Sequence, residues 1–170
     1  PMSPCFSSLI CATPPAPASP ADSSVSVDDW FPAIDVNSIR DKLRIGEGVV
    51  THERLVAAIE GAVITALRQL HAWRSAWAAS GADDLAAVDD VSIGGRKRSV
   101  VIWERIIRYY AAAEIADTHR DLVATDQANI RGENETLTAD DYRRMAHNAV
   151  SDLLSIGADR PVARNRVSLL

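Results

Sequence analysis

Residues 51–80 read THERLVAAIEGAVITALRQLHAWRSAWAAS and contain no proline. Within this stretch the large apolar side chains recur every three or four positions, at Val56, Ile59, Val63, Leu67, Leu70, Trp73 and Trp77. That spacing places them on one face of an α-helix, and Thr51 is a favourable N-cap. The stretch therefore predicts a helix roughly 40 Å long. Gly61 inside it costs about 1 kcal/mol relative to alanine, and a close helix crossing or simple tolerance explains it better than a functional hinge.

Two further helices are expected, one before and one after this stretch. Asp35 is a candidate N-cap for a short amphipathic helix, which glycines at positions 46 and 48 then end. Residues from about 98 to 123 carry two apolar stripes, so this helix should lie centrally with neighbours on both sides. The connection at residues 81–98 shows little periodicity. Its Gly94–Gly95 pair permits a tight turn, but we do not favour a strand pair there.

A fourth helix follows a polar loop at residues 124–137. Thr138 and Asp141 have the spacing of a capping box, apolar residues recur at helical spacing after them, and Gly157 is placed to end the helix. The expected fold is therefore all-α. It is a small helical bundle with two long helices, a third C-terminal helix and a short N-terminal helix.

Segments of different composition flank the helices. Residues 1–29 hold six of the eight prolines and no lysine or arginine, which predicts a proline-rich arm. Residues 158–170 have no helical apolar stripe, and neither set of alternate positions is consistently apolar. This pattern favours an extended arm lying on another surface. We thus expect an N-terminal arm at residues 1–29, a helical body at residues 30–157 and a C-terminal arm at residues 158–170.

Composition excludes several classes of protein. Of the 170 residues, 47% are apolar and only 5% aromatic, which excludes global disorder and favours helices over β-sandwiches and barrels. The net charge of −5 argues against general nucleic-acid binding. No uninterrupted apolar run reaches the roughly 20 residues of a membrane span, and no secretory signal is recognisable. A soluble intracellular protein is expected.

The sequence contains no recognisable catalytic or metal-binding pattern. Its four histidines are scattered without the spacing of metal ligands. The aspartates within residues 83–90 lack the alternating ligands and central glycine of a calcium loop, so they predict a solvated acidic connection. Cys5 and Cys11 lie in the N-terminal arm, without a rigid neighbour that would lower a thiol pKa. We therefore expect no catalytic activity, no metal and no cofactor.

A basic tripeptide, Arg96-Lys97-Arg98, follows the two adjacent glycines. Adjacent glycines do not supply the phosphate cradle of a P-loop. A solvated basic turn is the favoured interpretation, and a loop contact with DNA or with an acidic partner is the alternative.

Several short phrases carry a further signal through their order and spacing. They are Phe31–Asp35, Ile39–Arg40, Leu43–Arg44, Arg54–Leu55, Ala58–Ile59, Leu85–Ala86 with Val88, the Tyr109 region, His119–Asp121, Ala124–Asp126, Arg143–Arg144, Ala146, Ala149–Val150 and an Arg-Pro-containing C-terminal segment that is apolar at its end. Together they span roughly Trp30 to Leu170 and resemble the head completion proteins of tailed phages with contractile tails, of the peduovirus type. Those proteins are related in role to the head–tail connector, or adaptor, proteins. The proline-rich N-terminal arm departs from the family's pattern.

The resemblance implies a non-catalytic virion protein, assembled in the host cytoplasm and located at the head–tail neck. Such a protein binds beneath the portal ring after DNA packaging and forms a ring, commonly twelvefold, that extends the DNA channel. It also implies a docking surface for a tail terminator or tail completion protein. An acidic surface suits a channel through which DNA passes without specific binding, and no membrane contact is expected.

Candidate contact residues follow from the arms. For the portal or the neighbouring subunit we expect contacts from Arg160, Pro161, Arg164, Arg166, Val167, Leu169 and Leu170. The alternative loop contact is Arg96, Lys97 and Arg98. Two other classes of function stay open, namely a DNA-binding packaging or regulatory module that uses the basic tripeptide and an enzyme with an unrecognised site.

Overall fold

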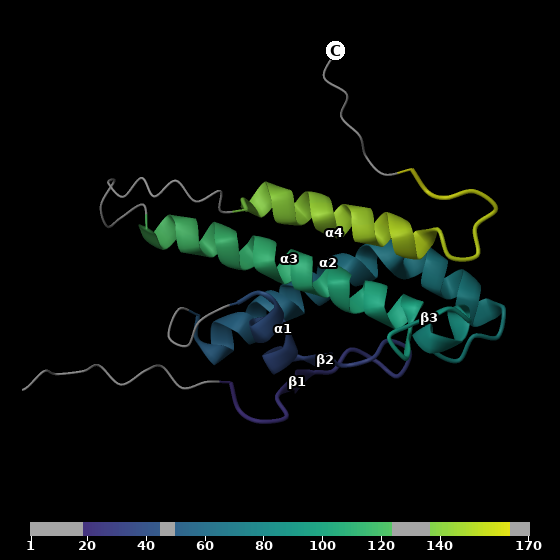
Figure 1. Cartoon of the computed structure of the whole chain (residues 1–170), viewed down its shortest axis with the longest axis horizontal. Helices are drawn as coiled ribbons and strands as arrows, with labels where there is room; N and C mark the ends of the chain where they lie inside the picture. The colour runs from purple at the N-terminus through teal and green to yellow at the C-terminus, as the bar shows by residue number, and fades with distance from the viewer. Residues whose placement is uncertain (1–18, 45–49, 124–136, 164–170) are drawn as a thin grey trace, which may run out of the picture.

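The computed structural model describes residues 19–44, 50–123 and 137–163, and Figure 1 shows their arrangement. The helices are α1 (Val36–Lys42), α2 (His52–Ala79), α3 (Arg98–Val123) and α4 (Ala139–Leu154), with a 3-10 helix η1 at Leu85–Val88. The strands are β1 (Ser24–Val25), β2 (Ile34–Asp35), β3 (Ser92–Ile93) and β4 (Arg96–Lys97), which form two separate two-stranded antiparallel pairs. The described part of the chain is mostly helical, which confirms the expected all-α class.

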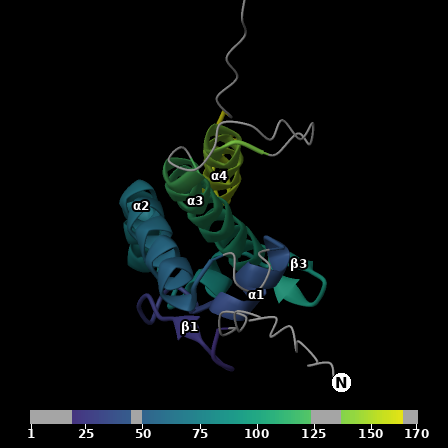
Figure 2. The same ribbon diagram turned by 90° about the vertical axis from the view of Figure 1, so that its left-hand side faces the viewer.

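Helix α3 is the centre of the bundle. It packs against α2 on one side and α4 on the other, whereas α2 and α4 contact each other at few points. Figure 2 shows α3 between its two neighbours, and in Figure 1 α3 and α4 run side by side in opposite directions. The double apolar stripe of this helix predicted such a central position, and the structure confirms it.

Side-chain caps fix where the helices begin. The carboxylate of Asp35 accepts a hydrogen bond from the Ser38 amide, and the Thr51 hydroxyl accepts one from the Arg54 amide. Thr138 and Asp141 form a reciprocal capping box at the start of α4. Each cap satisfies backbone donors that have no partner inside the helix. The three caps confirm the expected helix starts.

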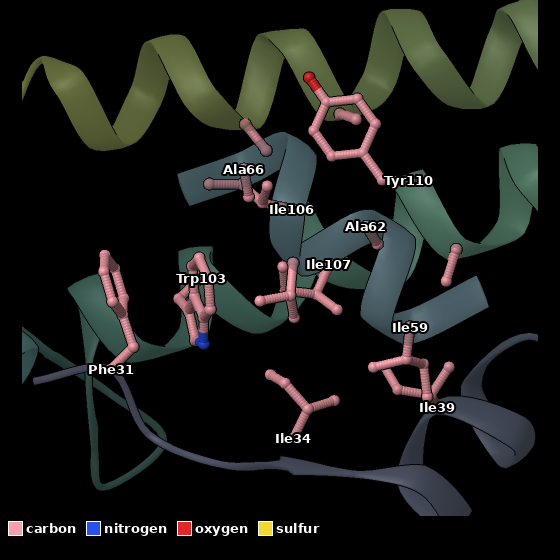
Figure 3. Packing of buried hydrophobic residues seen from close by; sticks show 14 of the residues in the cluster. Phe31, Ile34, Ile39, Ile59, Ala62, Ala66, Trp103, Ile106, Ile107 and Tyr110 are labelled. Carbon is pink, nitrogen blue, oxygen red and sulfur yellow. The ribbon is translucent and has the colours of Figure 1, made fainter. Parts of the chain in front are cut away.

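The hydrophobic core lies where α2 and α3 cross and is closed by the segment that precedes α2. From α3, Trp103, Ile106 and Ile107 are fully buried. Figure 3 shows Ile106 beside Ala66 of α2 and Trp103 beside Phe31. Phe31, Ile34 and Ile39 come from the N-terminal segment and cover the opposite side. Each fully buried side chain of this size contributes about 1.5–3 kcal/mol relative to exposure.

Aromatic rings attach the N-terminal segment to the helices. The Phe31 ring stacks on Trp103 with centroids 4.3 Å apart, and Trp30 meets Phe31 edge-on at 4.7 Å. The indole N–H of Trp30 donates to the Ala82 carbonyl at 3.1 Å, and that of Trp103 donates to the Pro32 carbonyl at 3.2 Å. Both indoles are therefore buried without an unsatisfied donor.

Residues 19–29, within the expected N-terminal arm, contact the body. β1 pairs antiparallel with β2, so that Ser24 lies opposite Asp35 and Val25 opposite Ile34. The buried Arg40 side chain donates to the Ser19 hydroxyl and, at 3.0 Å, to the Val50 carbonyl. The remainder of the expected arm, residues 1–18, lies outside the described residues.

The connection between α2 and α3 is more ordered than its sequence predicted. β3 and β4 pair across Gly94 and Gly95, whose φ angles of +59° and +77° suit a tight hairpin turn. Our expectation against a strand pair was wrong, because two adjacent left-handed glycines are the geometry that such a turn requires.

Helix α2 is long and apolar enough, by length and composition alone, to cross a membrane; no other helix in the described part of the chain meets this test. Glu60 and Arg68 interrupt its sequence, and its apolar face is used inside the protein. Leu55, Ile59 and Leu70 are all fully buried. One face of α2 therefore packs into the core.

Candidate interaction surfaces

The basic tripeptide at β4 and the start of α3 is paired with carboxylates. Arg98 contacts Asp89 through two hydrogen bonds of 2.6 and 3.1 Å. Arg96 pairs with Glu104, and the Lys97 ammonium lies 3.9 Å from Asp90. Local pairing of all three cations reduces the positive potential that a phosphate backbone would meet.

Asp89 is a buried structural group, which corrects our expectation of a solvated acidic connection at this one position; Asp83, Asp84 and Asp90 are exposed, as expected. Its side chain is only 6% exposed. Burial raises the pKa of Asp89, but hydrogen bonds from Arg98 and from the Val91 amide outweigh this effect and hold the pKa below its usual value. The pair ties the hairpin to α3, and the Leu85 carbonyl, which accepts from the buried Ser99 hydroxyl at 2.8 Å, ties η1 to the same helix.

A polar groove of about 340 Å³ runs along α3 between α2 and α4. Tyr110 lies at its centre: its hydroxyl is 2.7 Å from the Gln69 amide nitrogen and 3.2 Å from His147 Nδ1. Figure 3 shows the Tyr110 side chain extending from α3 toward α4. Burial raises the pKa of Tyr110 above its usual value, so the phenol stays neutral and serves as a hydrogen-bonding link between the three helices.

Glu114 closes the space between the polar groove and a smaller cavity of about 220 Å³ at the start of α2. Its carboxylate lies against Gly61, where any Cβ would meet the carboxylate group. Burial raises the pKa of Glu114. The neighbour of Gly61 is therefore the end of a flexible side chain, which agrees with simple tolerance of this glycine rather than with a close helix crossing.

An apolar groove of about 330 Å³ lies where the C-terminal ends of α2 and α4 meet. Its lining residues are Trp73, Ala76, Trp77, Ser80, Leu154, Ile156, Gly157 and Ala158. The Trp73 indole N–H donates to the Ile156 carbonyl at 3.3 Å, and Gly157, with φ of +78°, packs on the Trp77 ring. Both tryptophans are only half-buried. We name this feature the tryptophan groove.

The expected C-terminal arm starts at the rim of the tryptophan groove. Arg160 and Pro161 are exposed, and the Val162 amide donates to the Ser155 hydroxyl at 2.8 Å. The described part of the arm makes a loop beyond the end of α4 and turns back (Figure 1). The other expected contact residues, Arg164, Arg166, Val167, Leu169 and Leu170, lie outside the described residues.

The described members of the two predicted contact sets belong to different elements. Arg96 and Lys97 form β4 and Arg98 begins α3, whereas Arg160 and Pro161 follow the end of α4. Sequence reasoning also missed the tryptophan groove, although the same two tryptophans ended the apolar stripe of α2. Within the residues that the structure describes, no group of three or more histidine, cysteine, aspartate or glutamate side chains could hold a metal ion.

Comparisons with known proteins give one match. A family model described as phage head completion protein (GPL) matches residues 25–164 of the chain. No curated protein and no solved structure matches. The matched range begins at β1, includes all four helices and ends within the C-terminal arm.

Proposed function

We propose that this chain, which belongs to the phage head completion protein family, completes the head by binding the portal once DNA has been packaged. Its role is that of a structural virion protein. Bound to the portal, the copies form a twelvefold ring that extends the DNA channel and provides the docking surface for a tail terminator or tail completion protein. The family match over residues 25–164 is the observation that carries this proposal.

The shape and charge of the subunit support a ring at the head–tail neck. Ring closure requires two different surfaces on each copy, since head-to-tail contacts are heterologous. A helical body with an exposed arm at one end supplies two such surfaces. The net charge of −5 suits a channel wall along which DNA passes without specific binding.

The C-terminal arm supplies the proposed contact with the portal or the neighbouring copy. Arg160 is exposed at its start, and Arg164 and Arg166 follow in sequence. By contrast, Arg96 and Lys97 both lie beside carboxylates of their own subunit. No observation on the described residues favours the DNA-binding alternative over the structural role.

The test is co-sedimentation of the full-length protein with purified portal rings. We expect the wild type to bind, and the variant R160A/R164A/R166A to lose most of this binding while keeping its helical circular dichroism. The control variant R96A/K97A alters the other basic segment and should bind as the wild type does. If the wild-type protein does not bind portal rings, the proposed function is wrong. If only the control variant loses binding, the hairpin is the contact and the assignment to the arm fails.

A further inference from the structure

We propose that the tryptophan groove of one copy receives Val167 and Leu169 from the C-terminal arm of the neighbouring copy. The inference rests on the proposed ring and names the contact that closes it. It assigns a function to a surface that lies beside the arm and to an apolar segment, residues 165–170, that follows the family match.

The groove has the chemistry of a receptor for apolar side chains. Its walls are the rings of Trp73 and Trp77 together with Leu154 and Ile156. Both rings are half-buried. The other two tryptophans of the chain, Trp30 and Trp103, are by contrast buried. Tryptophans at the centre of apolar pockets are the residues that most often dominate the free energy of protein association.

The arm segment has the matching pattern. In an extended chain, alternate side chains point to the same side, so Val167 and Leu169 would enter the groove together. Arg164 and Arg166 belong to the opposite parity and would remain at the rim.

The rim of the groove is negatively polarised. The groove lies at the C-terminal end of α2, which is the negative end of the helix dipole, and the last turn contains no basic residue. Asp83 and Asp84, both exposed, follow directly. The charge of this end of the subunit therefore complements the two arginines of the arm segment.

The occupant comes from a neighbouring copy because ring closure requires a contact between two different surfaces of adjacent copies. The arm begins beside the groove of its own copy: Gly157 and Ala158 line the groove, and the Val162 amide donates to the Ser155 hydroxyl. Trapping between two different chains distinguishes a neighbouring arm from the copy's own arm.

The test is disulfide trapping between two full-length variants in which Cys5 and Cys11 are serine. One variant carries A76C, because Ala76 is exposed and lines the groove, and the other carries S168C. The two are mixed in a glutathione redox buffer, and disulfide-linked dimers are followed by non-reducing electrophoresis. A57C is the matched control for A76C, since Ala57 is also exposed on α2 but lies near its other end.

We expect the mixture of A76C and S168C to form linked dimers about tenfold faster than the mixture of A57C and S168C, since docking raises the effective concentration of the thiols. Adding L169S/L170S to the S168C variant should abolish this difference. Equal rates with A76C and A57C would overturn the proposal. So would a double variant, A76C/S168C in one chain, that forms only an intrachain disulfide at every protein concentration, because the groove would then hold its own arm.

Failure here and failure of the proposed function are separable. Portal binding is measured with unmodified wild-type protein and portal rings, whereas trapping uses this chain alone. A protein that binds portal rings but gives no preferential trapping keeps the proposed function and loses the groove assignment.

Discussion

Alanine at Gly157 should destabilise the protein by about 2–5 kcal/mol. Gly157 has a φ of +78°, and this left-handed conformation costs an L-residue about 1–2 kcal/mol. A Cβ at this position would lie 3.1 Å from Cη2 of Trp77 and closer still to Cζ2. Because the atoms it meets belong to a rigid ring, relieving the overlap requires displacement of the ring or the backbone, at a cost of about 1–3 kcal/mol.

Gly61→Ala is the matched control, because the same substitution should there have the opposite sign. Gly61 lies inside α2, where alanine is more favourable than glycine by about 0.5–1 kcal/mol. Its Cβ would lie 3.1 Å from Cδ of Glu114 and nearer to Oε2. This carboxylate is the end of a flexible side chain whose pKa is raised by burial, so it can turn toward water at little cost. We expect a gain in stability of about 0.5–1 kcal/mol.

Both free energies of unfolding can be measured by urea titration, followed by far-ultraviolet circular dichroism so that the readout does not depend on Trp77. Linear extrapolation gives the free energy of unfolding in water for each variant. The reasoning from ring rigidity and backbone conformation would be refuted if Gly157→Ala were neutral, or if both substitutions changed stability by the same amount in the same direction.

Two further substitutions test polar contacts. Asp89→Asn should destabilise the protein by about 2 kcal/mol at neutral pH by weakening the charged hydrogen bonds to Arg98. Because the folded-state pKa of Asp89 is lowered, its contribution is complete above the unfolded pKa of about 3.9 and is lost as pH falls through the folded value. The difference in free energy of unfolding between the wild type and Asp89→Asn should therefore shrink as the pH is lowered. A difference that stayed constant down to the lowest pH would contradict the role assigned to the Asp89 carboxylate. Tyr110→Phe removes the hydroxyl that contacts Gln69 and His147 and should lower the free energy of unfolding by about 1 kcal/mol, measured by urea titration, whereas an unchanged urea midpoint would show that this network does not stabilise the fold.

Helices were the part of the fold that sequence could predict, because their signals are local. The apolar stripe of α2 depends on residues three or four positions apart. The caps at Thr51 and Thr138 each act on backbone amides within three residues. They placed both helix starts where the structure has them. The central position of α3 was predictable as well, since a helix with two apolar stripes needs a neighbour on each side.

Features that depend on distant residues were not predictable in the same way. Pairing of Ser24 with Asp35 depends on a distant contact, because Phe31 between them stacks on Trp103 of α3. Asp89 looked like one more surface carboxylate, because only the folded chain shows that Arg98 returns to it. The tryptophan groove likewise exists only where the ends of two helices meet, so the stripe of α2 alone could not reveal it.

The antiparallel arrangement of α3 and α4 has a mechanical consequence. The C-terminal arm leaves α4 at its last turn (Figure 1), so a pull on the arm that is directed along the axis of α4 would load the contact between α4 and α3 in shear. Ala146, Ala149, Val150 and Leu153, all buried, would have to slide past α3 together before α4 could be extracted. A load in shear is shared among these contacts at once, whereas peeling would break them one after another. An arm attached in this way can transmit force from a neighbouring molecule to the central helix α3 without unfolding α4.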